Sequence, residues 1–463
     1  SFSAQGFPEG NFTRPSFANS YPEGGKPGYA ENKNRNANFY LNGGYVYDGR
    51  YLLDVNLRSD GTSVFGANKR FSTTWSVGLA WNVHREKFMK DKASFINVLK
   101  LRGSVGNPGN QNFSSYSAIT TYYFNNWMLN NFGTGVLVSK FGDPNLAWQR
   151  TLDKNIGINL SMFSNRFHVT VDFYHKRTDP LIADIGIPVS MGVEKRRTNI
   201  GVQVDKGVNG TIRYAILYKP QESINYTMSV NFRYGTAFYK NIGRSLNAYN
   251  QENISKNLTR YYDGGSPTAL WAVRSRGIDP ATGQEIFVKK DGTLTYTFDY
   301  KDEVEVGDSR PTLEGVWGNT FYYKGWSASL QLRYSFGADV FNSTLFNKVE
   351  NISSRSITTN QDRRALYNRW KKPGDKAKFK SISLTESTPM SSRFVMKENY
   401  LSIESVRLGY QFDSKWLKKA LRISSLNINM YMNSIARFST LEDERGLYYP
   451  FARSISFSLG AIL

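Results

Sequence analysis

The stretch Trp75–Val83, WSVGLAWNV, alternates large apolar residues with small or polar ones along its whole length. Trp75, Leu79 and Trp81 occupy one set of alternate positions, whereas Ser76 and its alternate neighbours occupy the other. Side chains of a β-strand point to opposite faces in turn, so a strand of this sequence has one apolar face and one polar face.

The same alternation recurs in about a dozen segments of the chain. Examples outside the first are residues 51–57, 156–162, 167–173, 226–234, 326–336, 426–432 and 455–463. Strands of soluble sandwiches usually span about five or six residues, whereas a tilted strand needs roughly nine to eleven to cross a bilayer. The longer length predicts an all-β fold, a transmembrane antiparallel β-barrel. A large soluble all-β protein that binds glycans is the weaker alternative.

Composition restricts the ways in which this chain could cross a membrane. Its 463 residues contain no apolar run close to the roughly 20 residues that a transmembrane helix needs. Hydrocarbon satisfies no backbone N–H or C=O group, so a membrane-spanning form must be a closed barrel. The absence of cysteine excludes disulfides and thiolate metal sites. Because Ser1–Ala4 does not start a signal peptide, we expect a removed signal or a start inside a longer protein.

The formal net charge of +21 is compatible with nucleic-acid binding, but the distribution of the cations argues against that function. Lys and Arg are dispersed along the chain, and several fall on the polar face of predicted strands, which faces the lumen of a barrel. The lumen-facing arginines expected from the alternation are Arg58, Arg102, Arg233, Arg333 and Arg407. They could contact a solute in the lumen.

The connections between the predicted strands are of two kinds that alternate along the chain. The clearest short ones are residues 48–49, 164–165, 219–223 and 324–325. The long ones are about residues 59–69, 106–149, 176–204, 240–311, 338–397 and 435–449. Outer-membrane barrels have short periplasmic turns and long extracellular loops, so the alternation predicts which end faces the cell exterior.

Thirteen strands fit between these connections. Their expected ranges are 38–47, 50–58, 71–83, 97–106, 150–163, 166–176, 205–218, 224–238, 312–323, 326–337, 398–412, 421–434 and 450–463. Single-chain bacterial barrels have even strand numbers, so we expect residues 1–463 to form part of one larger barrel domain.

Several motifs, taken in order, resemble one family. They are Arg58–Gly66, RSDGTSVFG; Leu99–Gly106, LKLRGSVG; Asp143–Trp148, DPNLAW; Gly277–Pro280, GIDP; and Tyr400–Ile403, YLSI. Together they resemble the SusC/RagA-type TonB-dependent outer-membrane transporters of Bacteroidota. The resemblance implies a 22-stranded barrel around an N-terminal plug, of which this chain would supply the carboxyl-terminal strands. Asn209 departs from the family, which commonly has Glu there.

The resemblance also implies a function and partners. We expect TonB-dependent import of oligosaccharides or peptides, a SusD-like surface lipoprotein as lid, and outer-membrane lipid around the wall. It further implies contact with the plug and remaining strands of the same protein, coupling to TonB through that portion, and a dimer of transporter–lid pairs. We expect the plug, rather than a solute, to be the partner of the lumen-facing arginines. No enzymatic activity and no nucleic-acid partner are expected. A plug-free structural or adhesin-like barrel is the alternative.

Candidate contact residues lie in the long loops, and no catalytic constellation is present. The aromatic clusters expected to contact the lid, to pack within their loops or to contact substrate are Tyr122, Tyr123 and Trp127, and Tyr261, Tyr262 and Trp271. Aromatic faces stack on sugar rings and pack on apolar partners alike. Glu442, Asp443 and Glu444 form a weak Ca²⁺ candidate, because Ca²⁺ prefers oxygen ligands, but a solvated loop is favoured. No other cofactor is expected.

Overall fold

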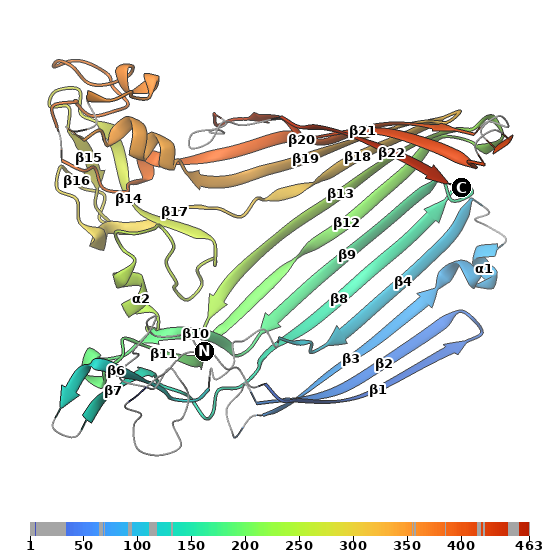
Figure 1. Cartoon of the computed structure of the whole chain (residues 1–463), viewed down its shortest axis with the longest axis horizontal. Coiled ribbons are helices and arrows are strands. Elements are labelled where there is room, and N and C mark those ends of the chain that lie inside the picture. Colours follow the sequence, from blue (N-terminus) through green and yellow to red (C-terminus); the bar gives the residue numbers. More distant parts are fainter. Residues whose placement is uncertain are drawn as a thin grey trace.

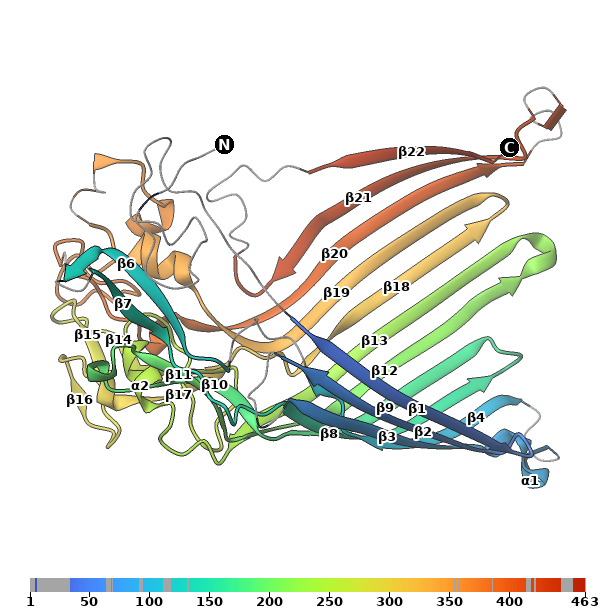
Figure 2. The ribbon, with the colours of Figure 1, turned by 60° about the horizontal axis from the view of Figure 1, so that its bottom comes forward.

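The computed structural model describes residues 5, 34–63, 68, 70–90, 95–110, 118–130, 133–353, 355, 358–384, 386–413, 418–419, 422–442 and 453–462. Its main feature is one antiparallel sheet in which thirteen strands follow each other in chain order. The sheet curves into a wall whose two borders are β1 and β22 (Figures 1 and 2). The predicted all-β fold and the thirteen strands are confirmed.

The wall strands are β1 Asn36–Tyr47, β2 Tyr51–Thr62, β3 Phe71–Asn82, β4 Ile96–Gly106, β8 Gln149–Met162, β9 Phe167–Thr178, β12 Val202–Lys219, β13 Ile224–Lys240, β18 Leu313–Tyr323, β19 Trp326–Phe341, β20 Val395–Phe412, β21 Ser425–Ser439 and β22 Ile455–Ile462. The two-residue strand β5, Gly109–Asn110, pairs with β8 beside this path. Adjacent wall strands pair residue for residue over long stretches, as where Leu79 lies opposite Leu53.

Short turns close the hairpins at one end of the wall. Asp48 and Gly49 both have positive φ, 48° and 61°, and so do Lys324 and Gly325, 45° and 91°. Two consecutive residues with positive φ form the type I′ turn, whose twist matches that of the flanking strands. This geometry explains why Asp-Gly and Lys-Gly stand at these positions.

The long connections carry secondary structure of their own, which period-two reasoning did not predict. Their strands are β6 Thr121–Asn130, β7 Gly133–Lys140, β10 Leu181–Gly186, β11 Lys195–Ile200, β14 Ala269–Ile278, β15 Glu285–Val288, β16 Leu294–Thr295 and β17 Glu303–Asp308. Helical segments are α1 Lys87–Lys90, α2 Asn247–Glu252, a π-helix at Leu345–Glu350, and 3₁₀ turns at Val83–Arg85, Val189–Met191, Pro220–Glu222, Tyr300–Asp302, Arg363–Leu366 and Ser392–Phe394. The small sheets gather at the end of the wall opposite the hairpin turns (Figure 1).

Bulges lengthen some strands beyond their expected limits. The register between β19 and β20 shifts between Ser335 and Ala338, where Gly337 has a φ of 82° and donates its N–H to the Asn399 side chain at 2.7 Å. This bulge lets β19 continue to Phe341 rather than end at residue 337. A second bulge at Glu404 shifts β20 against both of its neighbours. Bulges break the alternation on which the expected boundaries depended.

Aromatic side chains gather on the apolar face near the hairpin turns. Pairs with ring centroids 4.7–6.4 Å apart are Tyr51–Trp81, Phe95–Phe163, Phe167–Tyr214, Tyr226–Phe321 and Trp326–Tyr410. Barrels of the outer membrane carry such aromatic girdles at the boundary between hydrocarbon and headgroups. Among the described residues, no helix has the length and apolarity to cross a membrane.

One carboxylate, Glu86, joins this group of aromatic side chains to the turn between β3 and β4. Glu86 accepts hydrogen bonds from Trp81 Nε1 at 3.0 Å, from the Tyr51 hydroxyl at 2.9 Å and from Arg50 Nη1 at 3.0 Å. The bond from Trp81, followed by that from Tyr51, holds the pKa of Glu86 below its ordinary value. The stabilisation is therefore present above the ordinary glutamate pKa and is lost as pH falls through the lowered one.

Glu86→Gln is expected to release this contact at neutral pH. In protein labelled with fluorotryptophan, the ¹⁹F signal of Trp81 should shift on acidification in the wild type and should not titrate in the variant. Glu222→Gln, in an exposed turn where Glu222 pairs with Lys219 at 3.0 Å, is the matched control and should leave the Trp81 signal unchanged. A Trp81 signal that titrates equally in wild type and Glu86→Gln contradicts the assignment.

Candidate functional site

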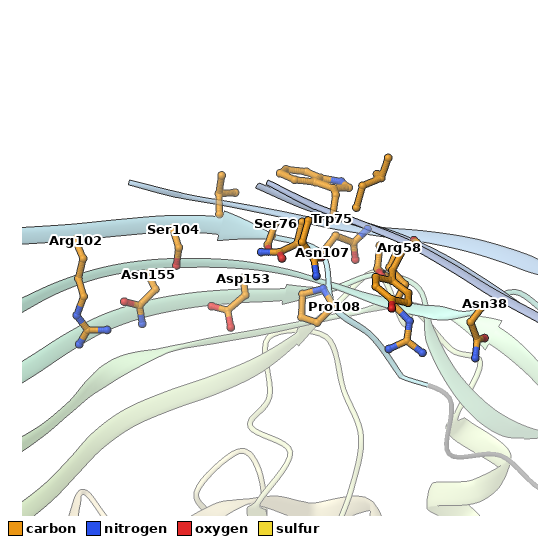
Figure 3. Close-up of a pocket in the computed structure, with 17 residues that line it drawn as sticks. Asn38, Arg58, Trp75, Ser76, Arg102, Ser104, Asn107, Pro108, Asp153 and Asn155 are labelled. Atoms are coloured by element: carbon orange, nitrogen blue, oxygen red, sulfur yellow. The ribbon is translucent and has the colours of Figure 1, made fainter. Parts of the chain in front are cut away.

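The polar face of the wall contains a recess of about 890 Å³ beside the first strands. Its polar lining includes Asn38, Asn42, Asn56, Arg58, Thr74, Ser76, Arg102, Ser104, Asn107, Asp153 and Asn155. Arg58, Arg102, Asp153 and Asn155 point to one side of the sheet, while Trp75 points to the other (Figure 3). Neutral amides and hydroxyls dominate this lining, and they can donate to and accept from an uncharged polar ligand.

The structure places most of the predicted lumen arginines beside carboxylates. Arg102 Nη2 lies 2.7 Å from the Asp172 carboxylate, and its Nε donates to the Asn159 side-chain oxygen at 3.2 Å. Arg58 Nε lies 2.6 Å from Asp60, whose residue is 2% exposed. These two guanidinium groups are held in fixed orientations beside the recess.

The other three arginines are less constrained. Arg233 lies 3.7 Å from Glu314, and Arg333 lies 3.4 Å from Glu404, in pairs whose side chains are exposed by about two-fifths to a half. Arg407 donates to the Asn429 oxygen at 2.8 and 3.1 Å and sits over the Tyr431 ring, with no carboxylate partner among the described residues. Exposed pairs of this kind contribute little to stability, so these groups stay available to a partner on the polar face. Contact with a plug remains a prediction.

Tyr122 and Tyr123 lie on β6 and are exposed, 62% and 48%. Tyr123 lines a second recess of about 650 Å³ between the β6–β7 and β10–β11 hairpins, together with Lys140, Lys195 and Arg197. Arg197 is held by Asp184 through two bonds of 2.9 and 3.0 Å. The side chain of Trp127 lies outside the described residues.

The second aromatic cluster is packed within its loop. The rings of Tyr262 and Trp271 are 4.7 Å apart, while Tyr261 lies 5.7 Å from Tyr239 and 5.4 Å from Tyr249. Tyr262 alone of the three predicted residues remains exposed, at 36%. Loop packing thus accounts for Tyr261 and Trp271, and contact of the cluster with lid or substrate remains a prediction.

Two of the motifs that carry the family resemblance have local structural roles. The Asn199 side chain donates to the Ala147 carbonyl at 3.0 Å and accepts from the Ala147 N–H at 2.7 Å, which fixes DPNLAW against β11. The Asp279 carboxylate accepts from the Tyr296 hydroxyl at 2.5 Å and from the Ala281 N–H at 2.9 Å. The bond from Tyr296 contributes most to holding the pKa of Asp279 below its ordinary value.

A buried polar cluster in the loops was missed by sequence reasoning. Arg393 bridges Glu285 at 2.8 Å and Glu350 at 2.6 Å, and these three side chains are at most 10% exposed. Ser391 donates to Glu285 at 2.5 Å, and Thr388 donates to Glu350 at 3.1 Å. The cluster joins the 240–311 connection to the 338–397 connection. Its members are too far apart in sequence for spacing to reveal them.

The described residues contain no group of three or more His, Asp or Glu side chains arranged to hold a metal ion. Glu442 instead pairs with Arg364 at 2.9 Å. Asp443 and Glu444 lie outside the described residues, so the Ca²⁺ site remains a prediction.

The comparison with protein families shows to which family this strand wall belongs. Residues 3–429 match the family described as TonB dependent receptor-like, beta-barrel. The chain belongs to this family. The predicted family, barrel fold and outer-membrane location are thereby confirmed, and the family is one of receptors and transporters rather than of enzymes.

Relatives of this TonB-dependent barrel extend well beyond its length. It is 27% identical over 454 residues to TonB-dependent receptor P39 of Formosa agariphila, covering 88% of this chain and 43% of that protein. It is 24% identical over 449 residues to TonB-dependent receptor SusC of Bacteroides thetaiotaomicron, covering 89% and 42%. The RagAB peptide transporter has a similar fold, with a TM-score of 0.77 at 20% identity over 88% of this chain and 44% of that one. The chain thus spans less than half the length of these relatives.

Proposed function

We propose that this chain supplies wall and extracellular loops to a TonB-dependent importer of oligosaccharides or peptides that works with a SusD-like surface lipoprotein. The polar recess of about 890 Å³ on the inner face carries the proposal. A volume of this size suits a segment of an oligomeric substrate, because binding sites commonly range from about 300 to 1,000 Å³. The family membership supports transport as the process.

The chemistry of the recess favours an uncharged polar substrate. Asn56, Ser104 and Asn155 offer amides and hydroxyls that pair with sugar hydroxyls or with peptide groups. Arg102 is already neutralised by Asp172, so it acts as an oriented donor rather than as a free cation. The name of the RagAB structure states peptide transport for that protein, which makes peptides the first substrate class to test.

Uptake by cells that carry the full-length gene tests the proposal. We expect uptake of labelled peptides or oligosaccharides to require both the gene and TonB, and a surface lipoprotein to co-purify with the product. An adhesin-like barrel without a plug predicts instead TonB-independent behaviour and open conductance of the purified protein in planar bilayers. That pattern would exclude active import.

Asn155→Leu is expected to weaken substrate binding by about tenfold or more, because it removes a hydrogen-bonding group from the recess. Ile156→Leu is the matched control: Ile156 is 67% exposed and neighbours Asn155 on β8, but its side chain points to the opposite face. Affinity for the transported substrate, measured on the full-length protein, should fall in the first variant alone. Equal affinities in the two variants would remove the recess from the binding site.

A further inference from the structure

Three basic residues form one row across the outer face of β8, β9 and β12, strands that lie side by side (Figure 1). Lys154 lies opposite His175, and His175 lies opposite Lys206 on its other side. All three side chains are exposed. Neighbouring strands are about 4.8 Å apart, so the row places three basic groups within about 10 Å.

The alternation of each strand puts this row on the lipid-facing side. Lys154 shares its face of β8 with Ile156 and Ile158, and His175 shares its face of β9 with Phe173, all of which are exposed apolar side chains. Asp153 and Asn155, the neighbours of Lys154, point instead into the inner recess (Figure 3).

The height of the row matches the outer boundary of the apolar band. Eight positions along β9 separate His175 from Phe167, whose ring belongs to the aromatic girdle near the hairpin turns. At about 3.3 Å per residue and a tilt near 40°, that distance is about 20 Å along the membrane normal, against an apolar band of about 25 Å. Phe173 and Tyr234 lie one step below the row and are half exposed, as aromatic residues at a headgroup boundary are.

The row has no carboxylate to neutralise it. Within the described residues, Lys154, His175 and Lys206 form no ion pair, whereas the adjacent Arg177 pairs with Asp179 at 2.9 Å. Lys206 and Lys240 both lie over the ring of Phe238, at 6.0 and 5.3 Å. Two ammonium groups, those of Lys154 and Lys206, thus flank His175 with no counter-ion among the described residues of the wall, so an external anion at this height would have two cations to pair with.

The outer faces of the strands further along the wall differ in character. On β18 the outward positions from Leu313 to Tyr323 include Trp317 and Phe321, and on β19 those from Trp326 to Phe336 include Leu332. Neither stretch carries a cation on this face. The basic row, with Lys240 on the neighbouring β13, thus differs from these two apolar stretches.

We propose that Lys154, His175 and Lys206 bind the phosphate groups of anionic lipids in the outer leaflet. Ammonium groups and a histidine ring offer N–H donors to phosphate oxygens, and the apolar side chains below the row pack against the acyl chains of the same lipid. The proposal rests on the outer-membrane location and is independent of which substrate is imported.

Lipid retention by the full-length protein tests this site. The protein is placed in phosphatidylcholine nanodiscs that contain either lipid A or lipid A stripped of its phosphates, and bound lipid is counted by native mass spectrometry after detergent extraction. The wild type should retain phosphorylated lipid A at least about tenfold better than the stripped form, given the attraction of each basic residue to anionic lipid. The combined Lys154→Gln, His175→Gln and Lys206→Gln variant should lose that preference.

A charge-matched control separates the row from net charge. Lys100→Gln, His168→Gln and Arg213→Gln remove the same kinds of group from the inner face of β4, β9 and β12, and should leave lipid retention unchanged. Lys154→Arg with Lys206→Arg should keep it, which guards against a folding defect in the Gln variant. Equal retention of the two lipids by the wild type overturns the proposal. Two other results overturn the proposal as well. One is that inorganic phosphate alone displaces lipid A from the wild type. The other is that the combined Gln variant loses a co-purifying protein rather than lipid.

Discussion

Arg393→Met is expected to lower the free energy of opening of the long loops by about 3–5 kcal/mol, because it leaves buried carboxylates without their cation. The side chains of Glu350 and Glu285 are 0% and 6% exposed, and both bond to the Arg393 guanidinium. Burial lowers the pKa of the neighbouring Lys380, so its ammonium is a poor substitute for the lost charge. Hydrogen exchange of residues 342–353 and 386–394 in the full-length protein should accelerate by two orders of magnitude or more.

Arg276→Met is the control for this prediction. Arg276 lies on β14 in the same loop assembly but is exposed, so its replacement should change the opening free energy by no more than about 0.5 kcal/mol. Adding Glu285→Gln and Glu350→Gln to Arg393→Met should recover part of the loss, because the uncompensated charges are gone. If exchange in Arg393→Met matches that in Arg276→Met, the cluster does not hold the loops together.

The wall was predictable because its physics is periodic. Each strand must present apolar atoms to lipid at every second position, and this requirement produces the alternation seen in WSVGLAWNV and the similar segments. The hairpin turns were predictable for a related reason, since the type I′ geometry at Asp48 and Gly49 demands residues that tolerate positive φ. Strand limits failed where bulges such as that at Gly337 broke the period.

The structure of the loops was not predictable, because it depends on contacts between residues that are distant in the sequence. Arg393 lies 43 residues from Glu350 and 108 from Glu285, and no local pattern links them. Tyr261 and Trp271 were identified as an aromatic cluster, but the residues against which Tyr261 packs, Tyr239 and Tyr249, were not. A sequence pattern states which side chains are available in a loop, whereas tertiary packing determines which of them remain exposed.

Arg260→Met is expected to lower the free energy of opening of the β14–β17 sheet by about 3–5 kcal/mol at neutral pH. Arg260 is 1% exposed and bonds to both oxygens of Glu303, at 2.8 and 3.0 Å. It also donates to the carbonyls of Asn257 and Ile254 at 2.8 and 3.0 Å. A third carbonyl, that of Thr259, accepts from Arg260 at 2.9 Å, so removing the guanidinium leaves a buried carboxylate and three carbonyl groups without their donor.

The loss in this variant should depend on pH in a defined direction. Burial raises the pKa of Glu303, and Arg260 opposes that rise, so the pKa of Glu303 climbs further in Arg260→Met. A carboxyl group whose pKa is raised by folding adds stability below its unfolded pKa, and that contribution disappears as pH rises through the folded value. The variant should therefore be markedly more stable at mildly acidic pH than at neutral pH, and the wild type less so.

Hydrogen exchange of residues 269–308 at two pH values, corrected for intrinsic rates, measures this difference. Adding Glu303→Gln to Arg260→Met should abolish the additional pH dependence, because no ionisable group then remains at the site. The two changes should also couple, so that the double variant is less destabilised than the sum of the single ones. A pH dependence that persists in the double variant would locate the titrating group elsewhere in the loop.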